Sequence, residues 1–198
     1  MVKKTIYFIL AIILLTAIYL TLFELLLHNF HYPFNTPIKD PITHSNTWIY
    51  LLKQQYISLI EVDAFNINEK RHLLDVKRVL ETTHFLWIIF SSFTLLLLII
   101  SFIKKILKKV LNYSIAIGAV INTLFIILSF NFLNSFNGFH KLFFAQNSWN
   151  FPKNSLLIDC FPLLYFQEFF ALFLILSFLI FIILNFYAKI SYENFNNR

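Results

Sequence analysis

Residues 85–109 read FLWIIFSSFTLLLLIISFIKKILKK, an apolar run that ends in two pairs of lysines. The apolar part, 85–103, is about as long as the roughly 20 residues that a helix needs to cross a bilayer. A water-soluble fold could not bury a run of this length on all sides. We therefore expect a transmembrane helix over 85–103.

Three further stretches have the same length and character, namely 5–27, 114–133 and 169–187. The composition agrees, because 59% of the residues are apolar and only 13% are charged, whereas soluble proteins carry about 25% charged residues. The first run is too long for a signal peptide and no small-residue cleavage site follows it, so it is expected to remain as an anchor. The sequence predicts an all-α membrane protein with four transmembrane helices, forming a single integral membrane domain over residues 1–198.

Lysine and arginine near the ends of the spans predict the orientation of the chain. They gather before the first span, between the second and third, and after the fourth: Lys3, Lys4, Lys104, Lys105, Lys108, Lys109, Lys189 and Arg198. These regions fall on one side, which the positive-inside rule makes cytoplasmic. Both termini are expected in the cytoplasm, and segments 28–84 and 134–168 on the outer face. Because topology accounts for the net charge of +6, no nucleic-acid partner is expected.

Several classes of enzyme are excluded by residues that the chain lacks. A single cysteine, Cys160, cannot form an internal disulfide or a CxxC pair, which excludes a membrane thiol oxidoreductase. Two glycines, Gly118 and Gly138, cannot build a glycine-rich phosphate loop, and no G-x-S-x-G elbow is present. No cofactor is expected.

All the histidines lie in the outward segments or at their edges: His28, His31, His44, His72, His84 and His140. Histidine is the side chain whose ordinary pKa lies near neutrality. The clustering therefore indicates acid–base chemistry on the outer face. Histidine also suits a membrane interface, so a purely structural explanation stays open.

Glu24 is an acidic residue near the outer end of the first span, followed at helical spacing by His28 and His31. An acid within a span is costly and is a functional candidate by default. A metal site would need further ligands, and no HExxH motif is present, so no metal is expected. Glu24 is expected to bond to a neighbouring helix or to a substrate amine.

Residues 66–83, NINEKRHLLDVKRVLETT, have the pattern of an amphipathic helix. Asn66 and Glu69 form a plausible capping box. His72 and Asp75 are three residues apart and can meet on one face, where a carboxylate would fix the tautomer of the imidazole. A solvated pair is the alternative. We expect a helix on the membrane surface, with an apolar stripe of Leu73, Val76 and Leu80.

Residues 136–170 are dense in phenylalanine and contain His140 and Trp149. Aromatic side chains of this kind belong at the headgroup level of a membrane, so an aromatic loop is expected on the outer face. Phe143 and Trp149 are expected to contact the substrate. His140 either anchors a re-entrant loop or acts on a lipid ester.

Three motifs in this order resemble the lipoprotein intramolecular transacylase (Lit) family: NEKRHLLDVKRVL (68–80), FHKLFFAQNSWNFP (139–152) and LLIDCFP (156–162). That family consists of small four-span proteins of the bacterial cell membrane, and the resemblance covers nearly the whole chain. The essential histidines of the family correspond to His72 and His140. Leu163 is a departure, because an acidic residue is expected after the proline of the last motif.

The resemblance implies an acyltransferase whose substrate is a lipoprotein in the outer leaflet. It would move the sn-2 acyl chain of a diacylglyceryl-cysteine lipoprotein onto its own α-amine, giving the lyso form. A histidine near its ordinary pKa can take a proton from the attacking amine. Protonated His72, Arg71 or Lys141 can stabilise the oxyanion, with Asp75 orienting His72. The alternative is a non-enzymatic membrane scaffold or assembly protein, which would tolerate His72→Ala and His140→Ala.

Overall fold

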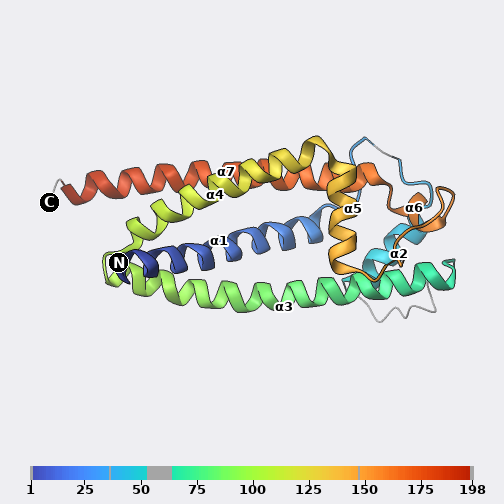
Figure 1. Ribbon diagram of the computed structural model, residues 1–198, viewed down its shortest axis with the longest axis horizontal. Coiled ribbons are helices and arrows are strands. Elements are labelled where there is room, and N and C mark those ends of the chain that lie inside the picture. The colour runs from blue at the N-terminus through green and yellow to red at the C-terminus, as the bar shows by residue number, and fades with distance from the viewer. Residues whose placement is uncertain (1, 36, 53–63, 147, 197–198) are drawn as a thin grey trace. The chain divides into compact units, whose positions relative to one another are not determined.

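The computed structural model describes residues 2–35, 37–52, 64–146 and 148–196, and these residues contain helices and no strand. In chain order the helices are α1 Val2–Asn29, α2 Pro41–Leu51, α3 Ile67–Ile103, α4 Leu107–Phe130, α5 Phe132–Phe143, α6 Leu156–Cys160 and α7 Leu163–Asn196 (Figure 1). The all-α prediction is confirmed. Residues 53–63 of the predicted outward segment 28–84 lie outside the described residues.

Among the described residues, four helical stretches are long and apolar enough to cross a membrane: Lys3–Asn29, Ile67–Ile103, Leu107–Phe130 and Leu156–Lys189. Each overlaps one of the predicted spans. The prediction of four candidate transmembrane helices is therefore confirmed, although each stretch begins before its predicted limit and the third ends at Phe130 rather than at 133.

The surface helix predicted over 66–83 is not a separate element. It is the first half of α3, which runs for 37 residues without a break. Neither proline nor glycine interrupts this stretch, and the hydroxyls of Thr82 and Thr83 bond back to carbonyls within the same helix. At about 1.5 Å per residue the helix is roughly 55 Å long, whereas the hydrocarbon core is about 30 Å thick. Because the first half is rich in charged residues, we assign only 85–103 to the membrane.

The start of α3 has the predicted capping box. The Asn66 side chain accepts a hydrogen bond from the Glu69 amide at 3.1 Å, and Glu69 Oε2 accepts one from the Asn66 amide at 2.9 Å. Two backbone donors that the helix itself cannot satisfy are thereby paired.

The aromatic loop predicted within 136–170 is also largely helical. α5 begins after Asn131, whose side chain accepts a hydrogen bond from the Asn134 amide, and it ends where Phe144 adopts an extended conformation. Pro152 and Pro162 then bracket the short helix α6, because proline cannot continue a preceding helix. Phenylalanine density therefore indicated the environment of this segment but not its backbone.

Contacts divide the chain into two compact units. Unit 1 is Met1–Leu25, His84–Ile127 and Phe173–Arg198, and unit 2 is Leu26–Thr83 and Leu128–Leu172. The single domain expected over residues 1–198 stays a prediction.

The core of unit 1 joins all four long helices. Leu14 of α1, Val110 and Leu111 of α4 and Ala188 of α7 are buried together, and Leu98 of α3 packs against them. Shape complementarity rather than hydrophobicity must hold such helices together in lipid, because the surrounding acyl chains are equally apolar.

A polar cluster also connects α1, α4 and α7 within unit 1. Asn122 is buried, and its side-chain oxygen accepts hydrogen bonds from the hydroxyls of Tyr19 at 3.1 Å and Ser177 at 3.0 Å. An amide within a span needs such partners, since lipid offers none. Asn122 is therefore satisfied by neighbouring helices.

A larger residue at Gly118 of α4 is expected to displace the Phe181 ring, because a Cβ atom there would lie 2.1 Å from Cε1 of Phe181. Gly118→Ala should lower the free energy of unfolding by about 1–3 kcal/mol through overpacking. Gly138 is the matched control, because a Cβ atom there meets nothing within 4 Å. Gly138→Ala lies within a helix and should be neutral or stabilising by about 0.5–1 kcal/mol. Thermal unfolding in detergent tests the pair, and equal melting temperatures would contradict the packing argument.

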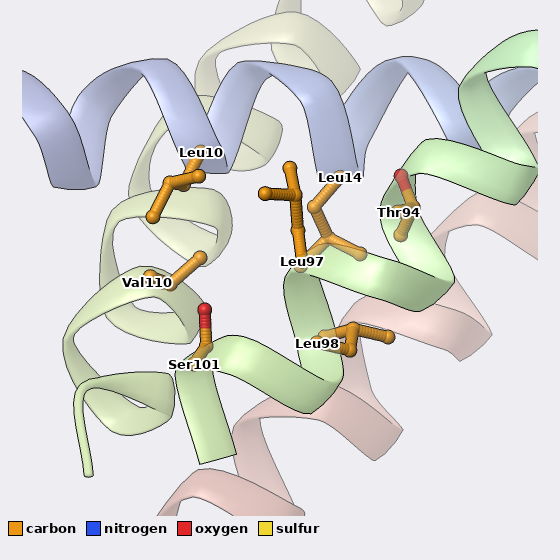
Figure 2. Close-up of a pocket in the computed structure, with 7 residues that line it drawn as sticks. All are labelled: Leu10, Leu14, Thr94, Leu97, Leu98, Ser101 and Val110. Atoms are coloured by element: carbon orange, nitrogen blue, oxygen red, sulfur yellow. The ribbon is translucent and has the colours of Figure 1, made fainter. Parts of the chain in front are cut away.

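A small cavity of about 10 Å³ lies in unit 1 (Figure 2). It is lined by Leu10, Leu14, Thr94, Leu97, Leu98, Ser101 and Val110. A volume of this size holds about one water molecule. The cavity is therefore too small for a lipid chain.

Candidate active site

Two histidines from different helices stack on one another in unit 2. The rings of His72, on α3, and His140, on α5, have centroids 5.9 Å apart and planes inclined by 28°. His72 is buried, with 7% of its surface exposed, and His140 is half-buried. The structure thus brings together the two histidines that the sequence motifs singled out.

His140 has a defined tautomer. Its Nδ1 lies 2.8 Å from the carbonyl oxygen of Phe136, one helical turn earlier in α5. A carbonyl oxygen only accepts hydrogen bonds, so Nδ1 carries the hydrogen and Nε2 of the neutral ring carries the lone pair. Nε2 of His140 is therefore a base.

His72 presents a buried nitrogen with no partner among the described residues. Its Nδ1 is fully enclosed and makes no hydrogen bond. A buried polar atom of this kind costs free energy unless something pairs with it. Within the stacked histidine pair, this nitrogen is a hydrogen-bonding group that the described residues leave unused.

Both rings are held neutral. Burial, reinforced by the nearby His140 ring, lowers the pKa of His72 to about 4. Burial also lowers the pKa of His140, against the opposing effect of its hydrogen bond to Phe136. At neutral pH the site therefore offers two uncharged imidazoles.

Aromatic rings surround the histidine pair. The centroid of Phe144 lies 4.8 Å from that of His72 and 5.2 Å from that of His140. Trp149 lies 5.1 Å from His140, and Phe151 lies 5.5 Å from His72. We call Phe144, Trp149 and Phe151 the aromatic wall.

Of the aromatic wall, the sequence predicted only Trp149. Phe144 and Phe151 were missed, although both lie in the phenylalanine-rich motif. They follow the end of α5, where the chain has no helical period from which the direction of a side chain could be inferred.

Asp75 does not contact His72, although it lies three residues further along the same helix. Its carboxylate pairs instead with Arg78, with Oδ1 at 3.5 Å from Nη1, while Nδ1 of His72 has no partner. The orienting role expected for Asp75 therefore has no contact to support it. Residues at this spacing can meet, but the His72 ring is directed toward α5.

Within unit 2, Arg71, Lys141 and Phe143 make no described contact with either imidazole. Arg71 and Lys141 are exposed, and the Phe143 ring packs on Phe139 with centroids 4.6 Å apart. Glu24 belongs to unit 1, where its carboxylate lies 3.2 Å from Nδ1 of His84 on α3. Glu24 was expected to bond either to a neighbouring helix or to a substrate amine, and this contact with His84 is of the first kind.

No metal centre is apparent in the part of the chain that the structure describes, because no group of three or more histidine, cysteine, aspartate or glutamate side chains is arranged to hold an ion.

Leu163, where the motif departs from the family pattern, is the first residue of α7 and is half-buried.

His44, which lies outside both histidine motifs, is fully buried in unit 2. Its Nδ1 lies 2.7 Å from the carbonyl oxygen of Cys160, and its Nε2 lies 2.6 Å from that of His31. Both oxygens only accept hydrogen bonds, so the ring donates to whichever carbonyl faces its N–H. The ring also packs against Tyr32 and Phe161. His44 therefore ties the end of α6 to the segment after α1.

Comparison with known proteins agrees with the motifs. A family model described as lipoprotein intramolecular transacylase Lit matches residues 2–166. A solved structure of the membrane integral lipoprotein intramolecular transacylase Lit from Bacillus cereus is similar over 96% of this chain and 93% of that one, with a TM-score of 0.65 and 20% sequence identity. No curated protein sequence matches the chain.

Proposed function

The chain belongs to the lipoprotein intramolecular transacylase family, and on that premise we propose that it moves the sn-2 acyl chain of a diacylglyceryl-cysteine lipoprotein onto the α-amine of the same cysteine. The product is an N-acyl, S-monoacylglyceryl lipoprotein, the lyso form. The observation that carries the proposal is the stacked His72–His140 pair, with an available lone pair on one ring and an unpartnered buried nitrogen on the other.

His140 acts as the base in the proposed reaction. The α-amine attacks the carbonyl carbon of the sn-2 ester, and Nε2 of His140 takes the proton that the amine loses. The protonated ring then returns this proton to the glyceryl oxygen as the bond between that oxygen and the carbonyl carbon breaks. Amine and ester belong to one molecule, so the reaction gains chiefly from held geometry.

His72 supplies a hydrogen bond rather than a charge. Its lowered pKa keeps the ring neutral. A neutral His72 therefore takes the place of the protonated His72 that was considered from the sequence. With its hydrogen on Nδ1, the ring can donate to the oxygen that becomes negative when the amine adds to the ester. A substrate oxygen would also satisfy this otherwise unpaired nitrogen.

The substrate is proposed to lie in the outer leaflet, because the lysines between the second and third spans favour a cytoplasmic location for that link. A reporter fused after Lys109 should be cytoplasmic, and one inserted at Lys153 should be external. An external reading at Lys109 would reverse the orientation.

The pH dependence of the reaction rate should reflect the α-amine of the substrate more than the two histidines of the enzyme. An α-amine has a pKa of about 7.7–8.0, so its reactive neutral fraction rises through this range. The histidine pKa values are lowered, so their protonation should limit the rate only well below about pH 6.5. The initial rate with a synthetic diacylglyceryl lipopeptide should therefore rise as the pH increases through the pKa of the amine. A fall in the rate as the pH is lowered through about 6.5, beyond the fall caused by the amine, would contradict the lowered histidine pKa values.

Mass spectrometry of a lipoprotein N-terminus tests the function. Cells that lack their own N-acylating activity should convert the diacylglyceryl form to the lyso form only when they express this chain. Without that conversion by well-expressed protein, the non-enzymatic scaffold becomes the better explanation.

A further inference from the structure

We propose that the aromatic wall decides between acyl transfer and hydrolysis by keeping water from the ester, and that Glu69 is a positioning residue which holds the wall against the histidine pair. This inference rests on the proposed function and adds to it the basis of reaction specificity.

A basic imidazole does not by itself distinguish an amine from water. Nε2 of His140 could equally take a proton from a water molecule that attacks the same ester. The water oxygen would then bond to the carbonyl carbon, the bond to the glyceryl oxygen would break, and that oxygen would receive the proton. The products would be a free fatty acid and a monoacylglyceryl lipoprotein whose α-amine remains free.

The surroundings of the histidine pair disfavour an ordered water. A buried water is typically held by two to four hydrogen bonds. Around the two imidazoles the described contacts are with aromatic rings, apart from the Phe136 carbonyl, which already accepts from Nδ1 of His140. Among the described residues an attacking water would find only the imidazole nitrogens as partners, whereas the amine is held close to the ester because both belong to one molecule.

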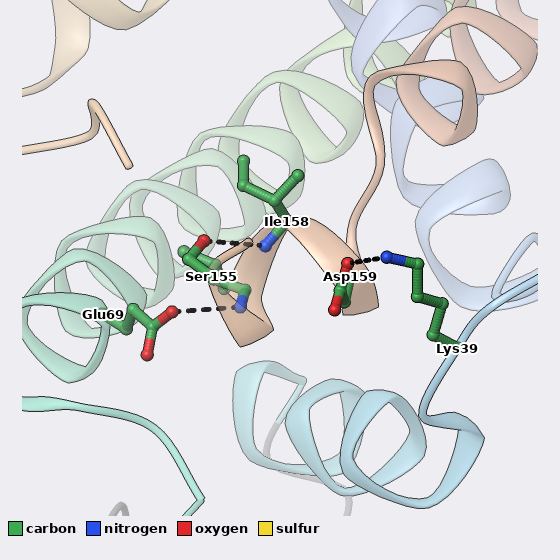
Figure 3. Close-up of polar contacts among 6 residues, drawn as sticks. Lys39, Glu69, Ser155, Ile158 and Asp159 are labelled. Carbon is green, nitrogen blue, oxygen red and sulfur yellow. Dashed lines mark hydrogen bonds and ion pairs between the residues drawn. The ribbon is translucent and has the colours of Figure 1, made fainter. Parts of the chain in front are cut away.

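Glu69 links the segment that carries the wall to the helix that carries His72. It lies one helical turn before His72 and is buried, with 2% of its surface exposed. Its Oε1 accepts a hydrogen bond from the Leu157 amide at 3.1 Å, in the first turn of α6, and Figure 3 shows the carboxylate directed at that turn. Oε2 is occupied by the Asn66 amide. Both carboxylate oxygens therefore have structural partners.

The connection from α6 back to the wall is short. Ser155 caps α6 by accepting from the Ile158 amide at 3.3 Å, and the Ser155 amide bonds to the Pro152 carbonyl at 2.9 Å. Phe151 directly precedes this turn, and Trp149 lies two residues earlier. Displacing α6 from Glu69 would move Phe151 and Trp149 away from the imidazoles.

The test measures two products from one substrate. The purified chain and its variants are given a synthetic diacylglyceryl lipopeptide, and N-acyl product and free fatty acid are quantified together. Trp149→Ala and Phe151→Ala should raise the ratio of fatty acid to N-acyl product on the order of tenfold, equivalent to about 1.4 kcal/mol of lost discrimination. Trp149→Phe keeps a ring at the site and should stay close to the wild-type ratio.

Glu69 is tested by its own series. Glu69→Ala should raise the ratio as the wall variants do, and Glu69→Gln should raise it less, because the amide oxygen can still accept from one of the two backbone donors. Phe34→Ala is the matched aromatic control, since Phe34 is exposed in unit 2 and its ring packs on Phe30. It should leave the ratio unchanged.

The outcomes separate this inference from the proposed function. If the wild-type chain makes N-acyl product and the variants lose rate at an unchanged product ratio, the wall does not control water and the inference is overturned. If the well-folded wild-type chain makes no N-acyl product, the proposed function itself fails, and the inference fails with it.

Discussion

Replacing His140 with alanine is expected to lower the rate of acyl transfer by about 10²–10⁴-fold, the usual cost of losing a general base. The expectation follows from the tautomer, because Nδ1 of His140 donates to Phe136 and leaves Nε2 as the proton acceptor. Conversion of the diacylglyceryl lipoprotein to the lyso form, measured by mass spectrometry at equal expression, gives the result.

His72→Ala should be comparably damaging, because it removes the donor proposed for the oxyanion. Two controls frame the comparison. His28→Ala removes an exposed histidine, and Asp75→Asn changes a carboxylate that pairs with Arg78 rather than with His72. Both should convert substrate at nearly the wild-type rate. Full conversion by His72→Ala or His140→Ala would contradict the catalytic assignment.

Replacing His44 with alanine is expected to produce the largest loss of stability, about 3–5 kcal/mol. The side chain is fully buried, and its ring nitrogens lie 2.7 Å from the carbonyl oxygen of Cys160 and 2.6 Å from that of His31. Alanine would leave a cavity among the surrounding rings and would remove the ring N–H that faces these two buried carbonyls. The free energy of unfolding of the purified protein in detergent measures the effect.

Two conservative variants separate the contributions that the two ring nitrogens of His44 make to stability. The side-chain amide of asparagine can take the place of Nδ1, and that of glutamine can take the place of Nε2. His44→Asn should retain the bond to Cys160 and His44→Gln the bond to His31, so each should cost less than His44→Ala. If His44→Ala unfolds at the same temperature as His28→Ala, the two short contacts contribute nothing to stability.

The spans were predictable because a bilayer imposes a simple requirement on composition. A run such as 85–103 has few alternatives to a transmembrane helix. The sequence predicted two helices that meet near Thr83, whereas α3 is continuous there, because the amphipathic pattern of 66–83 and the apolar run of 85–103 are both helical. Nothing in the residues between them ends a helix. Likewise, the caps at Asn131 and Ser155 are local signals that the high phenylalanine content concealed.

The histidine pair and Trp149 could be anticipated from motifs, whereas most other contacts around the pair could not. Sequence spacing placed His72 and Asp75 on one helical turn, but it could not show that Arg78 takes the carboxylate. Glu69 was correctly predicted as a capping residue, yet its second oxygen contacts Leu157, far along the chain. Contacts of this kind depend on how α3 and α6 pack, and one sequence does not encode them in any local pattern.

The burial of Cys160 has a practical consequence. It is the only cysteine in the chain, and none of its surface is exposed. Thiol-reactive reagents should therefore leave the folded native protein unmodified. Cys160 therefore need not be replaced before labelling experiments. A single cysteine introduced at a chosen surface position would carry the only reactive thiol.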